Sequence, residues 1–124
     1  MTTRVRINRP IKTEEVAVIR TTLKQAPTLP DLSHLADTVE QLRAVGQCGC
    51  GCDSVDFTSH DPAHDSQRIG DGVGITPSGG KVGVIVWGKN DAITGLEVYS
   101  LGAEDGDLKL PVPSSIQPFV PDNI

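Results

Sequence analysis

Aromatic residues are scarce in this chain. They make up 3% of its 124 residues, and they are Phe57, Trp87, Tyr99 and Phe119. A domain of this length buries about two-thirds of the surface of its unfolded chain, so Val, Ile, Leu and Ala must supply most of the buried area. The chain is too short for two ordinary domains. The sequence therefore predicts a single domain over residues 1–124 with an aliphatic core.

Basic residues are in deficit. The chain has 11 Lys and Arg against 16 Asp and Glu, a formal net charge of -5. Binding to a nucleic-acid backbone needs a basic patch, so nucleic acid is not an expected partner. The deficit lies in one part of the chain: residues 1–47 carry a formal charge of +2 and residues 48–124 carry -7. An acidic surface can steer a basic protein partner, although in most small proteins it only favours solubility.

Long apolar runs are absent. No stretch approaches the roughly 18 apolar residues of a membrane-spanning helix, and no apolar segment follows Met1–Arg6 as it does in a secretion signal. The three cysteines fall within five residues of one another, which is not the spacing of a disulfide framework. The expected protein is cytoplasmic, with reduced cysteines and no membrane contact.

Helical patterns fill the first part of the chain. Residues 1–12 alternate charged and aliphatic side chains and are expected to form an arm. A helix is predicted from Thr13, a plausible N-cap, until prolines 27 and 30 end it. A second helix is predicted beyond them, because four apolar residues form one helical stripe: Leu32, Leu35, Val39 and Leu42. The helical part covers residues 13–45.

Alternating β-branched residues mark the next part, residues 46–113, as sheet. Lys81–Trp87 is the clearest strand, and its apolar residues on both faces predict a central position. Ile93–Leu101 is expected to pair with it as a hairpin. An edge strand is also considered at Leu108–Leu110.

Glycine-rich and proline-rich segments are predicted to be irregular. The polar stretch 59–80 is expected to be loop with one short strand at most. Within it, Gly70–Gly74 resembles a phosphate-binding loop but lacks the flanking strand, helix and Gly-Lys-Ser/Thr, so a turn is predicted. Four prolines near the end predict an extended tail over residues 114–124. The predicted fold class is therefore α+β, with two N-terminal helices packed on an antiparallel sheet of three to five strands.

Two segments carry a resemblance. Val45–Gly46 leads through Cys50–Phe57 into a Ser-Val-Asp strand, and Gly95–Ser100 contains Leu-Glu-Val-Tyr. The combination resembles a group of small uncharacterised bacterial proteins with a Gly-Cys turn and a proline-bearing end. The resemblance spans residues 31–113. It implies one compact domain and brings no catalytic residue.

The cysteine cluster offers three interpretations. Thiolates two residues apart can chelate zinc, and two histidines downstream could complete the site, which gives the candidate metal ligands Cys48, Cys50, Cys52, His60 and His64. Alternatively, the glycines between the cysteines form a tight turn and the thiols are small buried apolar groups. A redox role is the third interpretation, although a Cys-x-x-Cys motif is absent.

Trp87 and Tyr99 lie on the predicted hairpin and are expected to share a face. If they are buried, they anchor the core; if they are exposed, they mark a partner site.

These observations favour a noncatalytic binding module. The leading hypothesis is an immunity-type or accessory protein whose acidic sheet and loop face binds a partner with a basic surface. An enzyme is less favoured, because no catalytic constellation is identified. The alternatives are a zinc-binding or thiol-redox protein, and a homodimer formed through Lys81–Trp87 if that strand lies at an edge.

Overall fold

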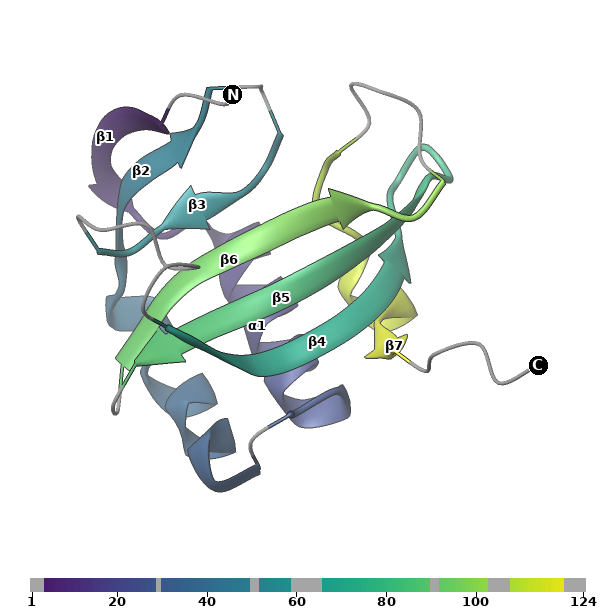
Figure 1. The fold of residues 1–124 in the computed structure, drawn as a ribbon, viewed down its shortest axis with the longest axis horizontal. Helices are drawn as coiled ribbons and strands as arrows, with labels where there is room; N and C mark the ends of the chain where they lie inside the picture. The colour runs from purple at the N-terminus through teal and green to yellow at the C-terminus, as the bar shows by residue number, and fades with distance from the viewer. Residues whose placement is uncertain are drawn as a thin grey trace.

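One antiparallel sheet organises the protein. The computed structural model describes residues 4–28, 30–49, 52–58, 66–89, 92–102 and 108–119. Within them the strands are β1 (Arg4–Pro10), β2 (Arg43–Cys48), β3 (Val55–Asp56), β4 (Gln67–Ile75), β5 (Lys81–Lys89), β6 (Ala92–Ser100) and β7 (Gln117–Pro118). The helical elements are α1 (Thr13–Gln25) and two 3₁₀ segments, η1 (Pro30–Gln41) and η2 (Pro113–Ser115). The strand order is β1-β2-β3-β6-β5-β4-β7 (Figure 1).

The predicted hairpin is confirmed. β5 and β6 pair antiparallel from Val82 opposite Ser100 to Lys89 opposite Ala92. β5 is also paired with β4 along its other side, so it is an internal strand. Because neither side of β5 is open, the homodimer that was considered through an exposed Lys81–Trp87 edge has no edge to use.

The helical elements cover one face of the sheet, and Figure 1 shows α1 behind β4, β5 and β6. Alternate residues of the central strands point toward α1 and η1, as period-two strand geometry requires. The core is aliphatic, as the sequence predicts, and its fully buried side chains include Val18, Ile19, Leu23, Val39, Ile69, Val82, Val84, Val86 and Leu96. Neither long helical element has the length and apolarity needed to cross a bilayer in the described part of the chain.

Three glycines of β4 let other elements approach its backbone. A Cβ on Gly70 would lie 3.0 Å from Thr22 Cγ2 of α1, and one on Gly72 would lie 3.0 Å from the Gln117 oxygen of β7. A Cβ on Gly74 would lie 2.7 Å from the Pro111 side chain. The contact at Gly74 is closer than a Cβ allows, and those at Gly70 and Gly72 would require the neighbouring atoms to shift. The segment predicted to be a turn is therefore a strand, because its alternate glycines form the contact surface for α1 and for residues 111–117.

The predicted fold class is wrong. Two N-terminal helices on three to five strands do not describe this protein, because the sheet has seven strands within the described residues and β1 precedes the helix. Residues 4–10, expected to be an arm, pair with β2. β2 begins at Arg43, inside the predicted helical part. Strand pairing is a contact between distant segments, so alternation in one segment does not reveal whether it has a partner.

Two further boundaries differ from the predictions. The second helical segment is a 3₁₀ helix over Pro30–Gln41. The four-residue step from Leu35 to Val39 fits an α-helix better, so the local spacing predicted the wrong helix type. The predicted extended tail contains η2 and β7, and β7 pairs with β4. Leu108–Leu110 is not a strand. The sequence also placed the N-cap at Thr13, whereas Lys12 occupies that position.

The sheet face away from the helices has its own close contact. Tyr99 of β6 pairs with Gly83 of β5, and the phenol ring lies so close over Gly83 that a Cβ there would overlap it. The ring therefore lies flat against the sheet.

Gly83→Ala should lower the free energy of unfolding by about 2 kcal/mol, because the new methyl group overlaps the Tyr99 ring. Urea denaturation followed by circular dichroism measures the change. In a Tyr99→Ser background the same substitution should be close to neutral. An equal loss in both backgrounds would contradict the assignment of the cost to the ring.

Candidate functional site

The sheet face opposite the helices carries the chain's single tryptophan and single tyrosine. Trp87 and Ile85 of β5 point to this side, because Val82, Val84 and Val86 point to the core. The pairing register puts six residues together, and we call them the aromatic face: Arg68, Asp71, Ile85, Trp87, Glu97 and Tyr99. Among the residues that the structure describes, no helix lies on this side of β4–β6 (Figure 1). The prediction that the two aromatic residues share a face is confirmed.

Hydrogen bonds and charge contacts connect the aromatic face. The Trp87 indole N–H donates to Glu97 Oε1 at 3.0 Å. The Arg68 guanidinium lies 5.8 Å from the centre of the Trp87 ring, within range of a cation–π interaction. Arg68 also reaches Asp71 Oδ2 at 3.4 Å. The Tyr99 hydroxyl donates to Asp71 Oδ1 at 3.3 Å. The side chains are thus held in place before any partner arrives.

The residues of the aromatic face differ in how deeply they are buried. Ile85 is only 5% exposed although it lies on the uncovered side, so its neighbours shield it. Trp87, Glu97 and Tyr99 are half-buried, and Arg68 is exposed. These aromatic side chains lie outside the buried core cluster. Hence Trp87 and Tyr99 do not anchor the core in the way that the buried alternative proposed.

The environment of Tyr99 changes its acidity. Burial raises the pKa of its phenol above the ordinary value of 10.0, and the negative charge of Asp71 together with the hydrogen bond to it raises the pKa further. The phenol therefore stays neutral at physiological pH and remains a hydrogen-bond donor to Asp71.

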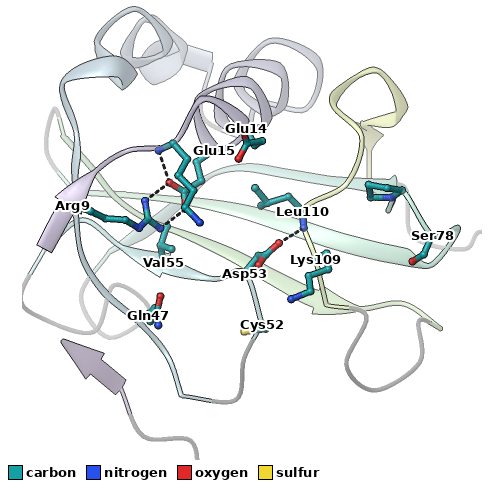
Figure 2. Close-up of a pocket in the computed structure, with 12 residues that line it drawn as sticks. Arg9, Glu14, Glu15, Gln47, Cys52, Asp53, Val55, Ser78, Lys109 and Leu110 are labelled. Carbon is teal, nitrogen blue, oxygen red and sulfur yellow. Dashed lines mark hydrogen bonds and ion pairs between the residues drawn. The ribbon is translucent and has the colours of Figure 1, made fainter. Parts of the chain in front are cut away.

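A pocket lies on the other side of the sheet, where α1 begins. Its volume is about 500 Å³, and its walls come from β1, the first turn of α1, β2, the residues around β3, the turn before β5 and residues 109–110. We call it the α1 pocket. Figure 2 shows Arg9 and Glu15 on one wall and Asp53, Lys109 and Leu110 on another. Val55, which is 3% exposed, belongs to its floor.

An ion pair forms the first wall of the α1 pocket. Arg9 Nη1 and Nη2 donate to the two carboxylate oxygens of Glu15 at 2.9 and 2.8 Å. The backbone N–H of Lys12 donates to Glu15 Oε1 at 2.8 Å. The side chain of Glu15 is 4% exposed and that of Arg9 is 26% exposed. The contact with Glu15 raises the pKa of Arg9, so the guanidinium stays charged.

Sequence patterns identify neither residue of this ion pair as part of a site. Glu15 is buried and joins β1 to α1. Arg9 was part of the predicted arm. Glu15 lies three residues after the N-cap and accepts a hydrogen bond from the N-cap N–H, as in a capping box, but Lys12 is not the Ser or Thr of that motif. No local sequence signal therefore identifies Glu15.

The predicted metal ligands are only partly placed. Cys48 and Cys52 are half-buried and are not joined in a disulfide, and Cys52 lines the α1 pocket. Cys50, His60 and His64 lie outside the described residues. Within residues 4–28, 30–49, 52–58, 66–89, 92–102 and 108–119, no three His, Cys, Asp or Glu side chains come together as a metal site. The zinc, redox and packing interpretations of the cysteines stay predictions.

Comparison with protein-family models, curated proteins and solved structures finds no match to this chain. The resemblance to small bacterial proteins therefore stays a prediction. The aromatic face and the α1 pocket are the two candidate sites of the described residues.

Asp71→Asn should lower the pKa of Tyr99, because the negative charge that opposes phenolate formation is removed. Tyr99 is the single tyrosine, so ultraviolet absorbance during an alkaline titration reports it alone. The folded pKa is raised, so the associated stabilisation is present below the ordinary pKa and is lost as pH rises through the folded pKa. A titration curve that does not move in the variant would contradict this.

Arg9→Met should lower the free energy of unfolding by about 2–3 kcal/mol, because Glu15 is left buried without its cation. Chemical denaturation at neutral pH measures the loss. Glu40→Gln is the control: it breaks the contact with Arg20, but Glu40 is 69% exposed, so the expected loss is about 1 kcal/mol or less. Similar losses of unfolding free energy in both variants would show that the buried Arg9–Glu15 pair stabilises the protein no more than the exposed Arg20–Glu40 pair.

Proposed function

We propose that this protein is a noncatalytic binding module and that the aromatic face is its docking surface for a protein partner with a basic surface. One observation carries the proposal. The chain's single Trp and single Tyr lie on the side of the sheet away from the helices, in hydrogen bonds with Glu97 and Asp71 respectively. The side chains are already ordered, so little conformational entropy is lost when a partner binds.

The residue types support a protein partner. Trp and Tyr are among the residue types that dominate the binding energy of protein interfaces, and the aromatic face contains one of each. Their apolar surfaces surround Ile85, while their polar atoms are already hydrogen-bonded within the face. A partner can therefore cover the rings without leaving these donors unsatisfied.

The charge supports a basic partner. Asp71 and Glu97 belong to the part of the chain whose formal charge is -7. Arg68 is the single cation of the aromatic face, and it lies over Trp87 while touching Asp71. A partner's Arg or Lys side chain can replace Arg68 there, because Arg68 is on the rim and its side chain is 57% exposed.

Pull-down with purified protein as bait, in lysate of the source cell, tests this proposal. Trp87→Leu should reduce recovery of the specific partner at least about tenfold, because a central aromatic contact is lost. The double variant Asp71→Asn/Glu97→Gln should bind less and lose salt sensitivity. Arg68→Gln should bind more, because the internal cation no longer competes.

The matched control is Asp37→Asn/Glu40→Gln, which removes the same charge from η1 on the helical side. It should bind like the wild type. Equal recovery with all variants, or loss only with the η1 variant, would overturn the proposal. Native mass spectrometry and thermal denaturation of each variant establish that it is folded.

A further inference from the structure

The α1 pocket is a second place where a ligand fits, and it is independent of the aromatic face. Its floor residue Val55 points to the helical side of the sheet, whereas Trp87 and Tyr99 point to the other side. A volume of about 500 Å³ lies within the usual range of small-molecule sites. The charged and apolar side chains that line the α1 pocket indicate which class of ligand it would bind.

Two clamps fix the walls of the α1 pocket. The Arg9–Glu15 ion pair joins the end of β1 to the first turn of α1, next to Lys12. On the other side, the Asp53 N–H donates to the Leu108 oxygen at 2.9 Å, and the Leu110 N–H donates to Asp53 Oδ2 at 2.8 Å. Lys109 lies between these two anchored residues. Both clamps fix the backbone beside a lysine of the lining, Lys12 on one side and Lys109 on the other, and both lysine side chains are exposed. Figure 2 shows Lys109 next to Asp53 and Leu110.

The charges of the lining are balanced. Three cations and three carboxylates line the α1 pocket: Arg9, Lys12, Lys109, Glu14, Glu15 and Asp53. Arg9 and Glu15 neutralise each other. Lys12 and Lys109 have no ion-pair partner among the residues that the structure describes. Asp53 Oδ2 accepts a backbone hydrogen bond from Leu110, and Asp53 forms no ion pair with another described residue. Charged groups of both signs that form no ion pair with another described residue therefore line the α1 pocket.

Apolar surface lies between these charges. Val55 and Leu110 both pack against the core, and both line the α1 pocket. An apolar group that entered here would cover carbon surface and leave the lysines and Asp53 to its polar ends. A ligand that carries only negative charge would be repelled by Asp53. A ligand that carries only positive charge would be repelled by Lys12 and Lys109.

We propose that the α1 pocket binds a small zwitterion of the amino-acid class with an aliphatic side chain. Lys12 and Lys109 hold its carboxylate, Asp53 holds its ammonium group, and Val55 and Leu110 contact its side chain. Charge-assisted hydrogen bonds at both ends give the site its preference for molecules that carry both charges.

Titration of the ¹⁵N-labelled protein with L-leucine, followed by NMR, tests this. The shifted amides should surround the α1 pocket, at Lys12, Asp53 and Lys109. N-acetyl-leucine lacks the ammonium group and leucinamide lacks the carboxylate, so each should bind at least about tenfold more weakly than leucine. Glycine lacks the aliphatic side chain and should also bind more weakly.

Two variants assign the ends. Asp53→Asn can still accept from the Leu110 N–H, so it should fold; it should weaken leucine about tenfold and leave N-acetyl-leucine unchanged. Lys109→Gln should weaken leucine and N-acetyl-leucine but not leucinamide. Lys24→Gln, at the exposed far end of α1, is the control that should change nothing.

Three outcomes would overturn the inference: no leucine-dependent shifts at millimolar concentration, shifts that lie away from the pocket, or equal binding of leucine and N-acetyl-leucine. The last would identify a site for anions in general. Trp87→Leu should leave leucine binding intact, so failure of the aromatic-face proposal and failure of this one are separable.

Discussion

The approach of α1 and the C-terminal segment to the backbone of β4 is the contact on which the rest of the structure depends. Gly70, Gly72 and Gly74 fall on one side of β4, where a side chain would crowd α1 and β7 and would overlap Pro111. The three contacts close the aliphatic core along its β4 side. Strand alternation then sends Asp71 and Val73 to the opposite side. The contact that covers one face thus determines what the other face presents.

The two sides of the sheet have different physical character. The covered side buries Val, Ile and Leu against α1 and η1, and its stability comes from apolar burial. The uncovered side protects its apolar atoms with its own side chains: Tyr99 lies over Gly83, and the neighbours of Ile85 leave it 5% exposed. Such a surface is stable in water and still offers aromatic area to a partner. This combination supports the proposed docking role of the aromatic face.

Both edges of the sheet have features that disfavour pairing with a further strand. On the β4 side, Thr28, Ala26 and Phe119 make backbone hydrogen bonds to Ile69 and Asp71, in addition to the short strand β7. On the other side, β1 has a register shift between Arg6 and Arg9, and it ends at Pro10. Irregularity, positive charge and proline all discourage strand addition. The faces, rather than the edges, are therefore the surfaces available for recognition.

The sequence alone determined the elements whose pattern is local. The β5–β6 hairpin, the helix after Lys12, the aliphatic core and the shared face of Trp87 and Tyr99 follow from alternation and periodicity within short segments. Only the tertiary structure decided that residues 4–10 and the glycines of β4 are strands, since both depend on partners distant in the chain. The same holds for the sites. Arg68 meets Trp87 only through β4–β5 pairing, and Arg9 meets Glu15 only because β1 turns directly into α1. Contacts between distant residues depend on tertiary packing, and the residue pattern of a single segment does not determine that packing.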